Sequence, residues 1–207
     1  MRIKRAMSVD QVLKSRKDLV DFEGDWELAF GKPEARGSWM IYADSGHGKT
    51  TFCMKLAKEL ARLGYRVLYN SIEEGDSAAM REIILRERLS DVRNRFRLVS
   101  ENMEELDARL SRRKSAQVVF IDSFQYSFLN KRTYYDWIKK YPQKLFIWIS
   151  HVEGKKPLGG AAVAVLYESR LKIFGEGFKF FSRGRTQGKR GYYVVWEEGA
   201  MRYWGEM

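Results

Sequence analysis

Residues 43–50, Ala-Asp-Ser-Gly-His-Gly-Lys-Thr, constrain this chain more than any other segment. They fit a phosphate-binding loop, in which a glycine-rich turn closed by Lys and Thr joins a strand to a helix. Gly46 and Gly48 let backbone N–H groups turn toward phosphate oxygens, while the following helix directs its positive end at the same anion. Lys49 is expected to bridge the β- and γ-phosphates, and the Thr50 hydroxyl to bind magnesium. The segment predicts binding of ATP with Mg²⁺ through Ala43, Asp44, Ser45, Gly46, His47, Gly48, Lys49, Thr50 and Thr51.

The residues on either side of this loop have the periodicity that it requires. Residues 39–43 are apolar throughout, as in a buried strand, although Ala43 replaces the usual first glycine of the motif. Apolar residues then recur at helical spacing through 52–63, and Gly64 is a typical helix stop. A strand, a phosphate loop and an amphipathic helix therefore follow one another in the order that the chemistry needs.

Strand and helix patterns alternate through the middle of the chain. Apolar strands are predicted at 66–71, 96–99, 118–122 and 145–150, with helices at about 80–87 and 103–110. Apolar strands that alternate with helices indicate a parallel sheet covered on both faces. After about residue 168, short strands are predicted at 170–174, 177–181, 192–196 and 201–204, as an antiparallel extension of that sheet.

The first 37 residues have no strong period. Ser8 and Gln11 form a capping-box pattern, which predicts a short helix through about Arg16. Glycines and a proline then indicate a loop-rich stretch at 24–37. We therefore divide the chain into an N-terminal arm at 1–37, which could serve oligomerisation, and a domain at 38–207.

Charge and composition narrow the classes of partner. Of the 207 residues, 38 are Lys or Arg and 27 are Asp or Glu, so the net charge is +11. This balance favours a nucleic-acid partner, although many small basic proteins bind no polyanion. The single cysteine, Cys53, excludes an internal disulfide, and the apolar runs are too short to cross a membrane. A basic start without an apolar stretch after it is no secretory signal, so a cytoplasmic location is expected.

Four further segments, taken in order, resemble the RecA-like ATPases, which include recombinases, DnaB-type helicases and KaiC-like proteins. The apolar strand 118–121 ends at Asp122, followed by Ser, and this carboxylate could hold magnesium through water. The strand from 67 leads to Glu73 and Glu74, and the strand from 147 ends in a Ser-His pair at 150–151. A Lys/Arg element follows at 179–185, and the resemblance covers about residues 36–204.

The resemblance implies a three-layer fold, with a mainly parallel central sheet and a C-terminal antiparallel extension, and a role for each segment. Glu73 is expected to orient the attacking water, with Glu74 as the alternative, although an acidic pair also suits a helix N-terminus. His151 would sense the γ-phosphate, unless it is a core or capping histidine. Arg183 or Arg185 would reach the nucleotide of a neighbouring subunit in a ring or filament.

The same resemblance implies contact with DNA, which is expected to be single-stranded. The loop after residue 151 is glycine-rich and basic, and Lys155 and Lys156 could contact a backbone phosphate without reading sequence. The basic run that follows, at 179–190, adds Lys179, Lys189 and Arg190 as candidates. A solvated hairpin would explain this run equally well.

Three functions are compatible with these features. The first is an ATP-hydrolysing accessory protein of DNA recombination, repair or replication. The second is a KaiC-like regulator that uses ATP to set its assembly state and binds no DNA. The third is a small-molecule kinase, with the segment 183–190 as its lid.

Overall fold

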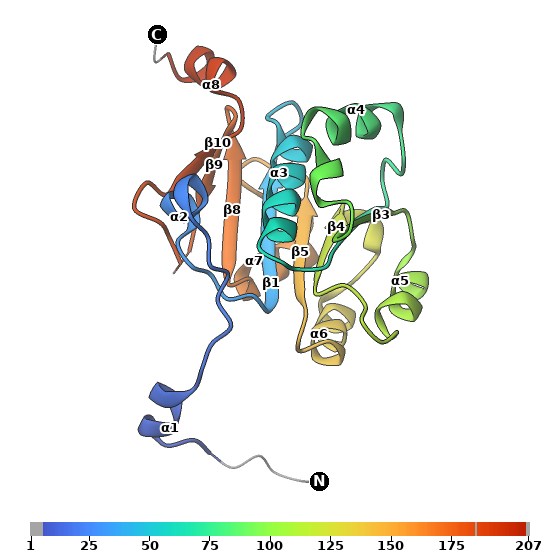
Figure 1. Cartoon of the computed structure of the whole chain (residues 1–207), viewed down its shortest axis with the longest axis vertical. Helices are drawn as coiled ribbons and strands as arrows, with labels where there is room; N and C mark the ends of the chain where they lie inside the picture. Colours follow the sequence, from blue (N-terminus) through green and yellow to red (C-terminus); the bar gives the residue numbers. More distant parts are fainter. Residues whose placement is uncertain (1–5, 185, 206–207) are drawn as a thin grey trace.

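An eight-stranded sheet runs through the centre of the part of the chain that the structure describes (Figure 1). The structure is a computed structural model and describes residues 6–184 and 186–205. The strand order is β10-β9-β8-β1-β5-β4-β2-β3. The parallel strands are β1 (Gly37–Ala43), β2 (Val67–Ser71), β3 (Phe96–Val99), β4 (Val118–Asp122), β5 (Leu145–Ser150) and β8 (Leu171–Glu176).

The register of the parallel strands brings several polar residues to one edge of the sheet. Ser71 at the end of β2 pairs with Asp122 at the end of β4, and Tyr42 of β1 pairs with Ser150 of β5. Because parallel strands all end at the same edge, the segments that follow β1, β2, β4 and β5 lie together. The segments that precede these strands lie together at the opposite edge.

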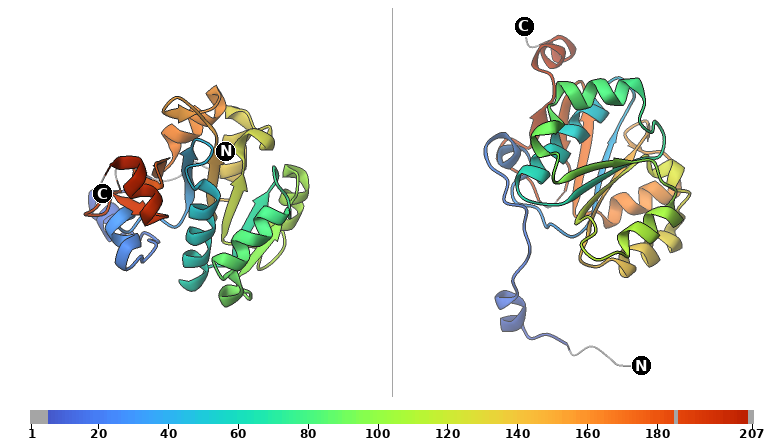
Figure 2. Two further views of the ribbon diagram at one scale, coloured as in Figure 1. Left: turned by 90° about the horizontal axis from the view of Figure 1, so that it is seen from above. Right: turned by 45° about the vertical axis from the view of Figure 1, so that its right-hand side comes forward.

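Helices cover both faces of the sheet, which gives the predicted three-layer α/β fold (Figure 2). Alternate residues of β1 show this: Trp39 and Ile41 face α3 (Lys49–Arg62), and Met40 and Tyr42 face the other layer. The first layer also contains α2 (Gly24–Phe30) and α4 (Ala78–Arg86), which the 3-10 helix η1 (Leu89–Val92) follows. The second contains α5 (Met103–Leu110), α6 (Lys131–Lys140), α7 (Gly160–Glu168) and the 3-10 helix η2 (Phe124–Ser127).

The antiparallel extension is shorter than the sequence predicts. β9 (Lys179–Ser182) and β10 (Tyr192–Val194) are antiparallel, but β8 pairs parallel with β1. The assignment of 170–174 to the extension is therefore wrong. Its cause is α7, a helix that the sequence did not predict and that connects β5 to β8 as a parallel crossover.

The end of the chain is a helix, α8 (Glu197–Trp204), so the strand predicted at 201–204 is also wrong. Aromatic residues favour strands, but two glutamates in the first turn and Arg202 in the last turn suit the helix dipole. Gly199 and Ala200 are buried, and the Trp196 ring lies so close to Gly199 that an added Cβ would be only 2.2 Å from it. α8 is near the top of the molecule in Figure 1.

The N-terminal segment divides into two parts. α1 (Val9–Lys14) has the predicted capping box of Ser8 and Gln11, buries no residue and stands apart from the sheet (Figure 1). In contrast, α2 replaces the loop predicted at 24–37, because Trp26 and Phe30 lie one turn apart and are buried against the sheet. Part of the predicted arm thus belongs to the main core.

α3 buries the thiol-bearing Cys53 completely against the sheet, and burial raises the pKa of this thiol well above its ordinary value. Across residues 6–184 and 186–205, no helix combines the length and the apolar composition that a membrane crossing requires.

Candidate active site

The phosphate-binding loop joins β1 to α3, as predicted. Gly46 and Gly48 have φ angles of 80° and 83°, which glycine adopts without strain. Gly48 is the residue before α3, and no side chain caps this helix. The first N–H groups of α3 therefore remain available to an anion at the positive end of the helix.

A cavity of about 350 Å³ lies over this loop and brings together most of the predicted site residues. It is lined by the loop after β1 and the start of α3, by the segment after β2, by the end of β4 and by the residue after β5. One residue each from α4 and from the β8–β9 turn completes the lining. The lining residues are Asp44, Ser45, Gly46, Gly48, Lys49, Thr50, Thr51, Glu73, Glu74, Ile83, Asp122, His151 and Phe178.

Lys49, His151 and Glu73 form a chain of polar contacts across the cavity. Lys49 Nζ donates to the Ala43 carbonyl at 3.3 Å and lies 3.5 Å from His151 Nδ1. His151 Nε2 lies 3.0 Å from Glu73 Oε2. Because an ammonium group can only donate, this arrangement fits a ring that accepts at Nδ1 and donates from Nε2 to Glu73.

Backbone hydrogen bonds hold Glu73, which follows β2, beside the last residue of β4. The N–H groups of Ile72 and Glu73 donate to the Asp122 carbonyl at 2.7 and 3.2 Å. Glu74 also lines the cavity but makes no hydrogen bond with His151. Of the two glutamates, Glu73 is thus the one fixed against both β4 and the residue after β5.

Asp122 lies deep in the cavity next to Tyr69 of β2. The Tyr69 hydroxyl donates to Asp122 Oδ2 at 2.6 Å. Burial raises the pKa of Asp122 to about 6, against the opposing effects of this hydrogen bond and of Lys49. A buried carboxylate of this kind is stabilised by a nearby cation, and the Thr50 hydroxyl is a second hard oxygen donor.

These two oxygen donors fit a magnesium ion that takes its remaining ligands from phosphates and water. Among the residues that the structure describes, no group of three or more His, Cys, Asp or Glu side chains could hold a metal. A protein-only metal cage is therefore absent from this part of the chain, and Mg²⁺ would enter with the nucleotide.

Several residues that contact the phosphate-binding loop were not predicted from the sequence. Arg86 donates to the Thr51 hydroxyl at 2.8 Å, and Phe178 packs close to Gly48, where an added Cβ would lie 3.3 Å from its ring. Gly177 donates its N–H to Nδ1 of the predicted loop residue His47 at 2.8 Å. No motif marks these residues, because they reach the loop from α4 and from the β8–β9 turn through tertiary packing.

A second cavity of about 470 Å³ adjoins the loop and shares Gly48, Thr51 and Phe178 with the first. Its other lining residues are Lys55, Arg86, Glu87, Val195 and Trp196. Phe178 and Trp196 meet edge to face, with ring centroids 4.9 Å apart. This cavity is therefore aromatic on one side and charged on the other.

Gln125 connects the end of β5 to the segment that follows His151. Its side-chain amide donates to Ser150 Oγ at 2.8 Å and to the Leu158 carbonyl at 2.9 Å. The Leu158 N–H in turn donates to the His151 carbonyl at 2.9 Å. The segment between them forms a small hairpin, with strands β6 (Val152–Glu153) and β7 (Lys156–Pro157).

The remaining candidate residues lie outside the cavity. Arg183 is exposed and lies over the Phe174 ring at 4.9 Å, and Arg185 lies outside the described residues. Lys155 is 3.8 Å from Glu176, while Lys156 and Lys189 are exposed. Lys179 is only 8 % exposed and its ammonium lies over the rings of Tyr192 and Trp204. Arg190 pairs with Asp25 at 2.8 Å.

Comparison with known proteins places this architecture. No protein-family model matches the chain, and no curated protein matches its sequence. Two solved structures do match its fold at 16% identity: the flagellar accessory protein FlaH from Methanocaldococcus jannaschii and the KaiC-like protein PH0186 from Pyrococcus horikoshii. Their TM-scores are 0.57 and 0.60, over 86% of this chain and 99% and 98% of theirs.

The fold is RecA-like. This confirms the fold expected from the phosphate loop and from the four ordered segments. The RecA-like fold alone leaves the partner open, since the two neighbours are described by different roles, one as a flagellar accessory protein and one as KaiC-like.

Proposed function

We propose that this chain binds ATP with Mg²⁺ and hydrolyses it. The observation that carries this proposal is the meeting of Lys49, Thr50, Glu73, Asp122 and His151 in one cavity at the N-terminus of α3. These residues come from four separate segments of the sequence. Together they supply a phosphate cradle, two oxygen donors for magnesium and a carboxylate beside the phosphate site.

Each side chain has a defined task in this proposal. The amides of residues 46–50 and the Lys49 ammonium bind the β- and γ-phosphates, and Thr50 with Asp122 hold Mg²⁺, which neutralises phosphate charge. Glu73 accepts a hydrogen bond from the attacking water and orients it toward the γ-phosphate. The adjoining cavity, with Phe178 and Trp196, takes the base and ribose.

His151 connects the nucleotide to the rest of the molecule. A γ-phosphate at Lys49 competes with the Ala43 carbonyl and with His151 Nδ1 for the ammonium protons. His151 then donates to the phosphate or turns fully toward Glu73. Because its backbone pairs with Leu158, this change is passed to the β6–β7 hairpin.

We further propose that ATP hydrolysis acts on nucleic acid, with single-stranded DNA as the natural probe. Lys155 and Lys156 lie in the hairpin that directly follows His151 and are exposed to solvent. The net charge of +11 supports a polyanionic partner. Lys179 and Arg190 support this less, because one is buried and the other is paired with Asp25.

The proposal includes an oligomer in which Arg183 or Arg185 completes a neighbour's site. Arg183 is exposed and lies outside its own nucleotide cavity, as a residue that acts in trans must. α1 buries none of its residues and has exposed Val9, Val12 and Leu13, so it is available to a second copy.

The second candidate is a regulator that uses ATP to set its assembly state. It is favoured by the fold neighbours, because one is a KaiC-like protein and the other an accessory protein. ATP hydrolysis measured with and without single-stranded DNA at low salt separates the candidates. Stimulation by DNA supports the first function, and hydrolysis that ignores DNA supports the second.

The Lys49→Ala variant tests the nucleotide site itself. The hydrogen-bond partners of Lys49 within residues 6–184 and 186–205 are the Ala43 carbonyl and His151, so its loss should leave the fold intact and remove ATP binding. Equal ATP affinity of Lys49→Ala and the wild-type protein would contradict the assignment. Circular dichroism of the variant shows whether the fold is retained.

A further inference from the structure

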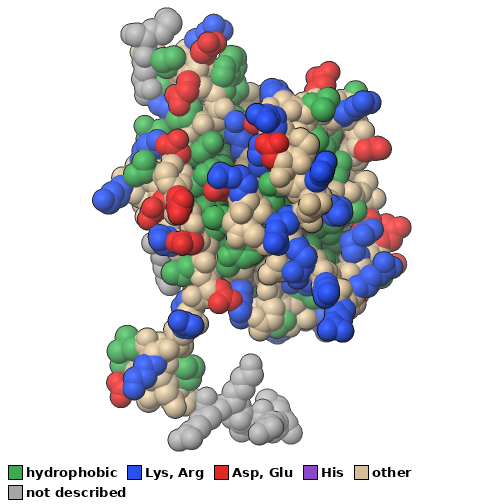
Figure 3. Space-filling view, in the orientation of Figure 1, with side chains coloured by type: hydrophobic (Ala, Val, Ile, Leu, Met, Phe, Trp, Pro, Cys, Tyr) green, Lys and Arg blue, Asp and Glu red, His purple; other side chains and the backbone are tan. Residues whose placement is uncertain are grey.

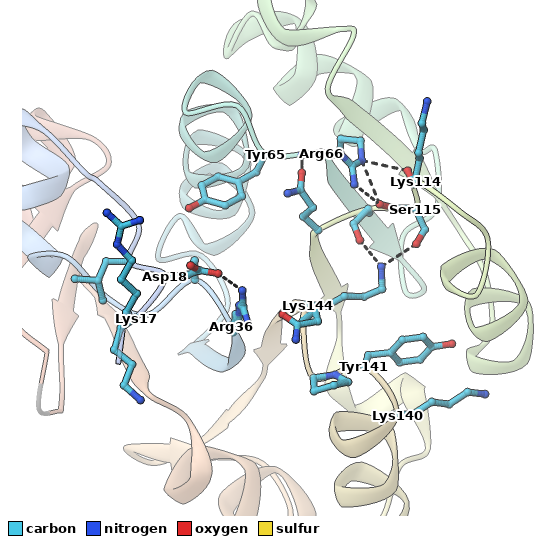
Figure 4. A pocket seen from close by; sticks show the side chains of 17 residues that line it. Lys17, Asp18, Arg36, Tyr65, Arg66, Lys114, Ser115, Lys140, Tyr141 and Lys144 are labelled. Carbon is cyan, nitrogen blue, oxygen red and sulfur yellow. Dashed lines mark hydrogen bonds and ion pairs between the residues drawn. The ribbon is translucent and has the colours of Figure 1, made fainter. Parts of the chain in front are cut away.

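A large cavity lies at the edge of the sheet opposite the nucleotide site (Figure 4). Its volume is about 880 Å³. Arg36, Arg66, Gln117 and Lys144 line it, and each directly precedes one of the strands β1, β2, β4 and β5. It is therefore built from the segments that enter the sheet, whereas the phosphate site is built from the segments that leave it.

This cavity is strongly basic. Its charged lining consists of one acidic residue and seven basic ones: Asp18, with Arg16, Lys17, Arg36, Arg66, Lys114, Lys140 and Lys144. A second cavity of about 320 Å³ shares Arg66 and the segment 114–116 with it and adds Arg95, Arg97, Arg109, Arg112 and Arg113. We call the two cavities together the basic groove. Figure 3 shows Lys and Arg side chains crowded on this side of the molecule, toward α5 and α6.

The cations at the centre of the basic groove are oriented by neutral acceptors. Arg66 donates to the carbonyls of Lys114 and Ser115 at 3.1 to 3.2 Å. Lys144 donates to the Ser115 hydroxyl at 2.8 Å and to the Ala116 carbonyl at 2.6 Å. Figure 4 shows both side chains converging on the segment 114–116. Asp18, the acidic residue of the lining, is paired with Arg36 instead.

Three cations of the groove are paired with carboxylates: Arg36 with Asp18, Lys140 with Asp107 and Arg109 with Glu101. At its centre, Arg66 and Lys144 are bonded to neutral groups instead, so their positive charge is not cancelled by these contacts. Burial lowers the pKa of Lys144, and the nearby charge of Arg66 lowers it further. An anion that enters the cavity opposes both effects, because its charge favours the protonated lysine. The hydrogen bonds to neutral groups fix where the cations lie without cancelling their charge, which is the arrangement that favours a bound phosphate.

We propose that the basic groove binds the sugar–phosphate backbone of a single-stranded nucleic acid. The groove presents a row of separated cations along two continuous cavities, which fits a chain with a phosphate at every residue. A membrane surface fits less well, because Leu19 is the one strongly exposed large apolar side chain that lines either cavity. The inference rests on the proposed action on nucleic acid and locates its main contact; it does not rest on ATP hydrolysis.

Position separates this surface from the hairpin that follows His151. The strands between the groove and the nucleotide site have five to seven residues, so the two lie roughly 20 Å apart. The sheet between them is fully buried and paired on both sides. Binding in the groove should therefore be insensitive to the nucleotide, whereas binding at the hairpin should depend on it.

The test is fluorescence anisotropy of a labelled oligodeoxythymidylate over a range of salt concentrations. Arg16→Ala/Lys17→Ala/Lys114→Ala removes three exposed groove cations and should weaken binding at least about tenfold, while the log–log salt slope flattens by about two units. Arg81→Ala/Lys131→Ala/Arg132→Ala removes the same charge from exposed positions outside the groove and should change affinity about threefold at most. ATP binding by both variants shows that they are folded.

Lys155→Ala/Lys156→Ala completes the comparison. If the groove variant loses affinity and this hairpin variant does not, with or without an ATP analogue, the inference is supported. If only the hairpin variant loses affinity, the inference is overturned while the proposed function stands. If the wild-type protein binds no oligonucleotide but binds phosphatidylserine vesicles through the groove, both the inference and the proposed action on nucleic acid are overturned. The proposal that the chain hydrolyses ATP does not depend on any of these three outcomes.

Discussion

At the scale of single residues, the site depends on two carboxylates in different surroundings. Glu73 is partly exposed and bonded to His151, while Asp122 is half-buried at the end of β4 and bonded to Tyr69. Burial raises the pKa of Asp122 from 3.8 to about 6. The two acids are thereby suited to different tasks, Glu73 to a water molecule and Asp122 to a cation.

Asp122 should destabilise the nucleotide-free protein at neutral pH. Between pH 3.8 and about 6 the folded state binds a proton that the unfolded state has released, so stability falls as the pH rises and the cost is complete above about 6. Asp122→Asn should thus raise the free energy of unfolding by about 1–3 kcal/mol at pH 7. Chemical denaturation should show no gain below pH 3.8.

The same variant should lose magnesium-dependent ATP binding, since the amide cannot balance the charge of the cation. Asp136→Asn, an exposed change on α6, serves as the matched control and should leave stability and binding unchanged. If Asp122→Asn is no more stable than the wild-type protein at pH 7, the charged Asp122 does not destabilise the folded state.

Glu73→Gln should bind ATP with unchanged affinity and hydrolyse it at least about a hundredfold more slowly. The amide oxygen of Gln can still accept the proton of His151 Nε2, so the shape of the site is kept while the carboxylate is lost. Single-turnover hydrolysis and a binding isotherm measure the two effects separately. Glu74→Gln is the control, and a reversal of the two phenotypes would make Glu74 the residue that orients water.

At the scale of elements, the sequence predicted the parts of the site that follow strands. Each of these segments begins with an apolar strand and ends in a chemically distinct residue, so Asp122, Glu73 and His151 could be identified. Helices whose apolar face is short gave no such signal. α2 was not predicted, because glycines at both of its ends indicate a loop. α7 was not predicted, because glycines and lysines precede it. The basic groove was missed because its cations come one or two at a time from distant loops.

The hairpin β6–β7 is the element most directly connected to the nucleotide. Gln125→Ala removes the hydrogen bonds to Ser150 and Leu158 that hold it against β5. We expect amide hydrogen exchange in 152–158 to rise by about fivefold, as for the loss of about 1 kcal/mol. The protection added by an ATP analogue should shrink at the same time. Gln143→Ala, exposed at the opposite edge of the sheet, should change neither quantity.

At the scale of the whole molecule, the proposed trans arginine requires a second copy of the chain. Arg183 lies outside the cavity of its own chain, and α1 has no partner within the described residues. A neighbouring copy that supplies an arginine and receives α1 would satisfy both.

Arg183→Ala should lower the rate of hydrolysis by roughly 10³-fold without weakening ATP binding. Mixing Arg183→Ala with Lys49→Ala should restore part of the activity, because each variant keeps the group that the other lacks at a shared interface. Light scattering on the same samples gives the mass. A fully active monomer, or no recovery in an assembled mixture, would remove the trans arginine from the proposal.

The buried thiol of Cys53 can be used to follow the opening of α3 and of the phosphate loop. The thiol lies inside α3, four residues after the lysine of the phosphate loop, and is the chain's one cysteine. A thiol reagent can modify it only while α3 is lifted from the sheet, which also dismantles the loop. Nucleotide at a hundred times its Kd should slow modification about a hundredfold. The same titration with Lys49→Ala should show no protection. The rate at which the Cys53 thiol is modified therefore measures how often α3 and the phosphate loop open.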